Sequence, residues 1–378
     1  MAQNITASAL NAIQARLNVM LAGGGPPAMD FDPNNNRAQT FAGLAENNAA
    51  NMSPLLDPTG TCIGMNVYHI DGAFTPDSTD YSSGFATDTC DITEGNQPVS
   101  VETQYEHNLF EREVVSIEDG DCDNLFVDPS AEGMDRVTEL IASRMMRAMV
   151  SLRVKLNAEA TTFLSSNATA VNRYTSLKDY MTFNAATSQF EVDLEGFFAD
   201  PDALTEIDLV ADLNDLPNYF IHSGPNNFYN AVQDARFRRL NDHQRYLIRF
   251  ETDLSAPISF DKRLDALLGG KNTFAIAPES YALWNVQLYN TQPTLVQEAD
   301  GIWVYSAPDP NLLINDRGVI RPVYYNITYQ KKCDGQNKLG KRKNIHAFQI
   351  DYVGGLAAAP QATDNHTGIL RFVDVTGI

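Results

Sequence analysis

The chain has 378 residues, enough to bury a large core and to form roughly two or three domains. Its apolar fraction of 43% is that of an ordinary globular protein and excludes wholesale disorder. The net charge is −21, and residues 1–154 hold 22 acidic residues against 7 arginines and no lysine. Such an acidic half argues against a protein that grips nucleic acid, but not against one that encloses DNA.

The sequence has no apolar run long enough to cross a bilayer, and LNVMLAGGGPP lacks the basic leader of a signal peptide. We therefore expect no membrane association. None of the four cysteines (Cys62, Cys90, Cys122 and Cys333) belongs to a CxxC pair. Free thiols in a reducing cytoplasm are the favoured interpretation, and disulfides are the alternative for a particle released from the cell.

The chain begins with a segment that should not be stable alone. Residues 4–21 have apolar positions at helical spacing and predict a short amphipathic helix, which must dock on the body or on another chain. The stretch GGGPPAMDFDPNNN then interrupts regular structure. Residues 39–92 predict an extended arm with short strands, one of them at 63–70.

Residues 97–118 alternate apolar and polar side chains in two runs separated by Glu106-His107-Asn108. This pattern predicts a hairpin with acids on its exposed face. Residues 134–166 follow, with apolar residues at steps of three and four and no internal proline or glycine. They predict one helix about 50 Å long, and its drift at 3.6 residues per turn disfavours a coiled coil.

In the second half of the chain, predicted strands and helices alternate. The patterns predict a hairpin at 183–192, a helix at 202–213, and a compact α/β domain at 215–330 with helices opening at Ser259 and Pro278. A basic loop begins at residue 330, and strands at 345–353 and 369–373 close the chain. The predicted class is α+β.

Motifs for chemistry are scarce. The histidines lack metal-site spacing, and Gly269-Gly270-Lys271 follows Asp265 where a phosphate loop needs its first glycine, so a helix end is favoured. Asp119, Asp121 and Asp123 have calcium-loop spacing, but Asn124 and Ser130 replace the Gly and Glu that shape such a loop, so an acidic turn is favoured. The sequence predicts no catalytic, cofactor-binding or metal-binding residue, no cofactor and no enzyme. The histidines are His69, His107, His222, His243, His346 and His366.

Two basic clusters stand out from the acidic background. They are either solvated faces or partner surfaces, and the acidic segments of neighbouring copies are the natural partners. The clusters are Arg236, Arg238, Arg239, Arg245 and Arg249, and Lys331, Lys332, Lys338, Lys341, Arg342 and Lys343.

The order of parts resembles the major capsid protein of tailed double-stranded DNA phages, the Hong Kong 97 type fold shared with encapsulins and the herpesvirus capsid floor. The resemblance covers about 40 to 378 and is architectural, without a shared motif. It implies an N-terminal arm at 1–92, an extended hairpin loop at 93–125, a peripheral domain at 126–214 with spine helix 134–166, an axial domain at 215–330, and a return to peripheral strands at 331–378.

The resemblance further implies a structural protein of the virion. Copies form pentamers and hexamers of an icosahedral shell that assembles in the host cytoplasm and encloses DNA without reading its sequence. Scaffolding, portal and decoration proteins are the further partners it implies. Some relatives join the loop to a neighbour by a Lys–Asn isopeptide bond, but here the first lysine is Lys155, so we expect no such bond. No long charged coiled region precedes the arm, so a fused scaffold is not expected.

Two alternatives stay open. The first keeps the fold and makes the shell an encapsulin compartment that loads enzyme cargo. The second is a soluble α/β enzyme with its chemistry in 215–330, against which the missing motifs count.

Overall fold

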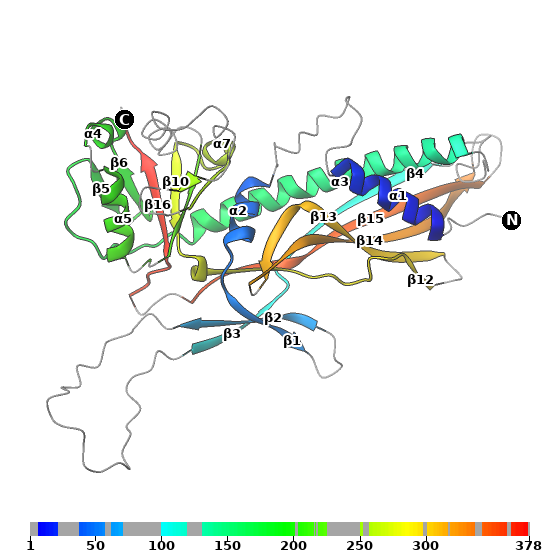
Figure 1. Ribbon diagram of the computed structural model, residues 1–378, viewed down its shortest axis with the longest axis horizontal. Helices are drawn as coiled ribbons and strands as arrows, with labels where there is room; N and C mark the ends of the chain where they lie inside the picture. The colour runs from blue at the N-terminus through cyan, green and yellow to red at the C-terminus, as the bar shows by residue number, and fades with distance from the viewer. Residues whose placement is uncertain are drawn as a thin grey trace, which may run out of the picture.

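A computed structural model describes residues 7–21, 38–56, 62–70, 100–118, 131–200, 203–214, 216, 218–224, 250–251, 257–297, 301–316, 318–336, 342–360 and 364–376. Helices and sheets are both present and are not arranged as a regular β–α alternation. The predicted α+β class is therefore confirmed. The described residues form an elongated molecule along which one helix runs for most of the length (Figure 1).

That helix is α3, Ala131–Ser166, which confirms the helix predicted at 134–166. Its 36 residues correspond to about 54 Å. Residues at helical spacing, among them Ile141, Met145, Met149 and Leu152, are fully buried. Stability comes from this apolar stripe, because a helix gains most of its stability from packing.

The stripe packs on a six-stranded sheet of order β11-β15-β14-β13-β12, with β4 also paired to β15. Phe348, Ile350 and Tyr352 of β15 belong to the same buried cluster as the α3 stripe. β4 pairs along one edge of β15, and β14 and β11 follow one another along the opposite edge, because Gly354 pairs with both Leu109 and Asn285. The strands are β4 Leu109–Glu118, β11 Tyr281–Asn285, β12 Thr294–Gln297, β13 Ile302–Asp316, β14 Val319–Gln336 and β15 Arg342–Ala358.

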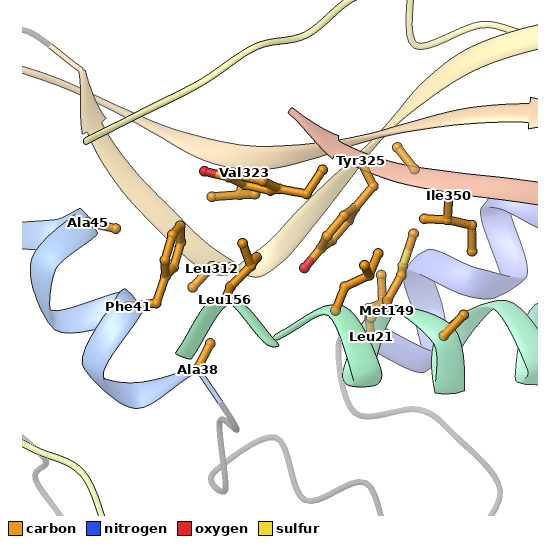
Figure 2. Packing of buried hydrophobic residues seen from close by; sticks show 14 of the residues in the cluster. Leu21, Ala38, Phe41, Ala45, Met149, Leu156, Leu312, Val323, Tyr325 and Ile350 are labelled. Atoms are coloured by element: carbon orange, nitrogen blue, oxygen red, sulfur yellow. The ribbon is translucent and has the colours of Figure 1, made fainter. Parts of the chain in front are cut away.

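Two short helices cover this core from the N-terminal side. α1, Ala7–Val19, confirms the helix predicted at 4–21 and docks on α3 and β13 of its own chain, with Leu10, Ile13 and Leu17 buried. α2, Gln39–Asn47, lies where an extended arm was predicted, and that prediction was wrong. Figure 2 shows Phe41 and Ala45 of α2 turned toward Leu156 and Val323 of the shared core.

A second body surrounds a seven-stranded sheet of order β5-β6-β16-β10-β7-β9-β8. Its own core includes Phe190, Val210 and Phe372, and α4 and α5 lie on it (Figure 1). The elements are β5 Met181–Asn184, β6 Gln189–Val192, α4 Leu194–Ala199, α5 Ala203–Leu213, β7 Phe220–Ser223, β8 Phe250–Glu251, β9 Pro257–Phe260, α7 Leu264–Leu268, β10 Asn272–Ile276 and β16 Ile369–Asp374. The hairpin predicted at 183–192 and the helix predicted at 202–213 are confirmed.

The sheets divide the chain differently from the predicted segments. Within 215–330, β7 to β10 belong to the seven-stranded sheet and β11 to β14 to the six-stranded sheet, so this stretch is not one α/β unit. Strands β5 and β6, expected beside the spine helix, and β16, expected in the closing peripheral sheet, also belong to the seven-stranded sheet. The local pattern identifies a strand but does not specify which distant strand it pairs with.

Two predicted helix starts were wrong. Ser259 lies in β9, and the helix after it, α7, begins at Leu264. Pro278 opens only the short 3-10 helix η4, Pro278–Ser280, which is followed by strand β11. All five residues of β11 are buried, so tertiary burial outweighs the start signal of the proline.

The third sheet projects from the middle of the molecule (Figure 1). Its order is β1-β2-β3, with β1 Asn51–Leu56, β2 Cys62–Ile70 and β3 Ser100–Glu106. The strand predicted at 63–70 is confirmed. The hairpin predicted at 97–118 was wrong: its two strands exist, but β3 pairs with β2 and β4 pairs with β15. Glu106-His107-Asn108 lacks the glycine or Asn-Gly pair that a tight hairpin turn requires.

Candidate functional site

A network of buried polar side chains lies where α2, α3, β7 and β9 meet. Helix α3 supplies Asn157 and Thr161, α2 supplies Thr40, β7 supplies His222, and Asp261 follows β9. Each of these side chains is at most 1% exposed. Buried polar groups persist only when they are hydrogen-bonded, so this junction specifies how the elements meet.

Asn157 caps α2 from a different helix. Its Oδ1 accepts from the backbone N–H of Thr40 at 2.7 Å and of Phe41 at 3.3 Å. The first N–H groups of a helix have no partner within it, and Ala38 at the N-cap provides no side-chain acceptor. The missing cap signal in the sequence explains why α2 could not be predicted.

The donors and acceptors of the junction can be assigned starting from the carboxylate of Asp261. Thr40 Oγ1 donates to Asp261 Oδ2 at 2.7 Å, because a carboxylate accepts and the hydroxyl has one hydrogen. His222 must then donate from Nε2 to Thr40 Oγ1 at 3.0 Å, and its Nδ1 lies 2.7 Å from Ser259 Oγ. Asn157 Nδ2 also donates to Asp261 Oδ2, at 2.8 Å. When the imidazole is neutral with its proton on Nε2, Nδ1 accepts from the hydroxyl of Ser259.

The charge state of His222 agrees with this arrangement. Burial lowers the pKa of His222 to about 4, and the nearby carboxylate of Asp261 opposes the shift only in part. The histidine is neutral at pH 7 and is a fixed structural group of the junction.

Ser259, His222 and Asp261 are residue types that also form hydrolase triads, but their connection is different. Thr40 lies between the imidazole and the carboxylate, whereas a triad needs a direct histidine–carboxylate bond. Gly43 lies against the serine and the histidine: a Cβ there would be 3.0 Å from Ser259 Oγ and 3.4 Å from His222 Nδ1. The arrangement holds elements together and lacks the direct histidine–carboxylate bond of a triad.

A buried ion pair joins α3 to the six-stranded sheet. Arg153 Nε donates to Asp309 Oδ2 at 2.8 Å, with side chains 2% and 0% exposed. Tyr325 Oη donates to the same carboxylate at 3.3 Å, and burial raises the pKa of this phenol far above its ordinary value. The register of β13 with β14 shifts between Asp309 and Leu313. The pair therefore ties the middle of α3 to an irregularity in β13.

Glu111 and Glu113 of β4 face helix α3, whereas the acids of this stretch were predicted to face solvent. Lys155 Nζ lies 2.9 Å from Glu113 and 3.6 Å from Glu111, and Ser151 Oγ donates to Glu113 at 2.8 Å. The ammonium of Lys155 lowers the pKa of Glu113. At the far end of α3, Arg16 of α1 pairs with Glu139.

The projecting sheet is attached by a few specific contacts. Tyr105 Oη donates to the backbone carbonyl of Ala358 at 2.9 Å, and Trp284 Nε1 donates to His107 Nδ1 at 3.2 Å. The side chain of Asn108 exchanges two hydrogen bonds with the backbone of Leu356. The link between β3 and β4 is therefore bound to the end of β15.

The motifs considered from sequence divide into those that the structure tests and those outside it. Gly269 and Gly270 follow α7 with φ of 73° and 81°, and Lys271 pairs with Asp374, which confirms a helix end in place of a phosphate loop. The acidic turn at 119–123 and the arginine cluster at 236–249 lie outside the described residues, as do Lys338 and Lys341. The other members of the lysine-rich cluster lie at the adjoining ends of strands β14 and β15; they are Lys331, Lys332, Arg342 and Lys343.

Over the described ranges, no three His, Cys, Asp or Glu side chains are grouped as a metal site. Within the same ranges, no helix has both the length and the apolar character needed to cross a membrane.

Comparison with known proteins gave structural likeness only. No family model and no curated protein matches the chain. A putative capsid protein of a prophage of E. coli CFT073 is similar, with a TM-score of 0.40, 10% identity, and coverage of 99% of this chain and 100% of that chain. A chain of Mycobacterium phage Che8 has a TM-score of 0.35, 11% identity and coverage of 85% and 92%. The cyanophage Pam1 capsid asymmetric unit has a TM-score of 0.35, 9% identity and coverage of 92% and 94%.

Proposed function

We propose that the protein is the major capsid protein of a tailed bacteriophage and that many copies self-assemble into an icosahedral shell around double-stranded DNA. Its role is then structural and not enzymatic. The described residues support this role by their form: a long helix on a long sheet, a separate compact body at one end, and a projecting sheet in the middle (Figure 1).

The observation that carries the proposal is the projecting sheet, whose core is too small to stabilise it alone. Ala50, Met52, Met65 and Val67 are its buried apolar residues, and they pack on Ala282, Trp284 and Ala357 of the body. Neither outer strand, β1 or β3, pairs with a further strand in the described part of the chain. Open edges of this kind are normally covered, and in a shell a neighbouring copy would cover them.

The charge suits this role. Residues 1–154 hold 22 acidic residues and no lysine, so packaged DNA would move past the shell wall without being held by it. In this proposal scaffolding, portal and decoration proteins are the further partners. The shell assembles in the host cytoplasm and becomes part of the virion.

The test is to express the chain and to image the purified product by negative-stain electron microscopy. The proposal expects shells tens of nanometres across, or tubes and sheets of the same subunit. A monomer or dimer at all concentrations would contradict it. The contents of particles purified from the producing cells distinguish the two shell functions. Packaged DNA supports a phage capsid, whereas a co-purifying enzyme in place of DNA supports an encapsulin compartment.

A further inference from the structure

The second body is attached to the first body, α3 with the six-stranded sheet, near the end of α3. Helix α3 contacts α7, and Leu164 in its last turn shares a buried cluster with Phe274 and Ile369 of the second body. The chain segments that cross between the bodies meet at the same place. Their backbones are joined by three hydrogen bonds, which link Thr169 with Ile369, Ala277 with Gly368, and Ala359 with Ser280. A body attached at one place can still turn about it, so a second contact is needed to fix the angle.

Helix α2 supplies that second contact. It contacts α3 and β13 of the first body, and β7 and β9 of the second (Figure 1). Asn157, which caps α2, lies about 14 Å before Ser166 along the axis of α3. Strands β7 and β9 are the next two strands beyond β10, which places them about 5–10 Å farther across the sheet. The two contacts are therefore well separated, and together they fix the angle between the bodies.

The two sides of α2 are held in different ways. Toward the first body, Phe41 and Leu44 are buried in the apolar core, so α2 belongs firmly to that body. Toward the second body the helix presents Gly43. A Cβ at this position would be 3.0 Å from Ser259 Oγ and 3.4 Å from His222 Nδ1. Glycine is the least favourable helix residue after proline, and here its missing side chain permits the close approach of β9.

We propose that the close approach at Gly43 fixes the angle between the two bodies and thereby sets the curvature of the shell. All copies in a closed shell share the same fold, so a change of angle within the subunit is repeated at every contact between copies. Moving β9 outward by about 1 Å, at about 14 Å from the end of α3, would tilt the second body by about 4°. The inference rests on the proposed shell function and identifies a residue that determines shell size.

The test places a larger side chain in this contact. Gly43→Val adds a branched side chain between α2 and β9, and valine is no worse a helix former than glycine, so α2 itself should persist. We expect shells of a different mean diameter, or tubes and sheets in place of closed shells, by electron microscopy. Ser259→Gly in the same chain removes the side chain that the valine meets. The double variant should therefore return to the wild-type diameter.

A second measurement follows the angle in the subunit itself. Spin labels on Asp212→Cys of α5 and Val114→Cys of β4 report the distance between the bodies in dilute, unassembled protein, after the four native cysteines are replaced by serine. Both label positions are exposed. The distance should shift in Gly43→Val and return in the double variant. If the valine variant is insoluble, the smaller change Gly43→Ala takes its place.

Gly196→Ala is the matched control. A Cβ at Gly196 would be 2.8 Å from Tyr180 Cβ, so this change strains the second body internally. It should alter neither the label distance nor the particle diameter. An unchanged label distance in the Gly43 variant, or a shifted distance with the wild-type diameter, would overturn the inference and leave the shell function intact. A wild-type chain that never assembles would reject the shell function and, with it, the role in curvature.

Discussion

Asn157 shows how much of this structure depends on single side chains. It caps α2, donates to Asp261 and lies in the middle of α3, so one amide joins three parts of the chain. In the sequence it is an unremarked polar position in a long helix, and Asp261 is one of 48 acids. The junction could not be predicted, because its members come from residues 40, 157, 161, 222 and 261 and only the fold brings them together.

Leu152 gives the simplest test of the α3 core. It is fully buried, so Leu152→Asp places an unpaired carboxylate in an apolar site and should abolish folding of the subunit and not merely assembly. Val154→Asp is the matched control, because Val154 is 37% exposed on the same helix. Soluble yield and circular dichroism measure the difference. A folded Leu152→Asp monomer that fails only in assembly would contradict the expectation.

His222 predicts a pH dependence of stability. Its pKa is about 4 in the folded protein, below the ordinary value of 6.5, so the unfolded chain binds the proton more readily. The stabilising effect of the neutral histidine is complete above pH 6.5 and is lost as the pH falls toward 4, by about 3 kcal/mol in the free energy of unfolding. Denaturant unfolding between these pH values measures it.

A His222→Gln variant serves as the comparison for that slope. Glutamine keeps one donor and one acceptor but does not titrate in this range. The difference between wild type and variant should therefore shrink steadily from neutral pH to pH 4. Equal slopes for the two proteins would show that another group carries the acid sensitivity.

At the scale of elements, both apolar packing and the ion pair Arg153–Asp309 fix the position of α3 on the six-stranded sheet. Removing only the cation leaves a buried carboxylate without its partner. Arg153→Met should therefore destabilise the subunit by about 3–5 kcal/mol in the free energy of unfolding.

The double variant Arg153→Met with Asp309→Leu removes both charges and should recover most of that loss. Thermal or chemical unfolding of both variants measures the effect. A double variant as unstable as the single one would mean that the pair is needed for more than mutual neutralisation, such as fixing the irregularity of β13.

Strands β3 and β4 show the limit of pattern reasoning for elements. Alternation of side chains correctly placed both strands, and in β4 it matches the burial of Val115 and Ile117 and the exposure of Val114. The pairing of β4 with β15 joins residues more than 200 positions apart, and no local feature of the chain specifies it. For the same reason the pattern could not show that β16 belongs to the seven-stranded sheet and not to the sheet beside α3.

At the scale of the whole molecule, the absence of lysine before Lys155 still argues against an isopeptide cross-link, although β3 pairs with β2 and not with β4. The projecting strands β2 and β3, and every residue between them, lack the amine that an isopeptide cross-link requires. Purified particles should therefore dissociate to a single monomer band on a denaturing gel. A ladder of covalent multimers that disappears when a residue of 62–106 is replaced would contradict this.

The amino-acid sequence by itself determined the local features: the long helix, the short N-terminal helix, the main strands, the acidic N-terminal half and its missing lysines. These follow from side-chain period and composition, which act over a few residues. Only the tertiary structure decided which strands share a sheet, where α2 forms and where the two bodies divide. Those outcomes depend on burial and hydrogen bonds between residues far apart in the chain, as Asn157 on α2 and β15 on β4 show.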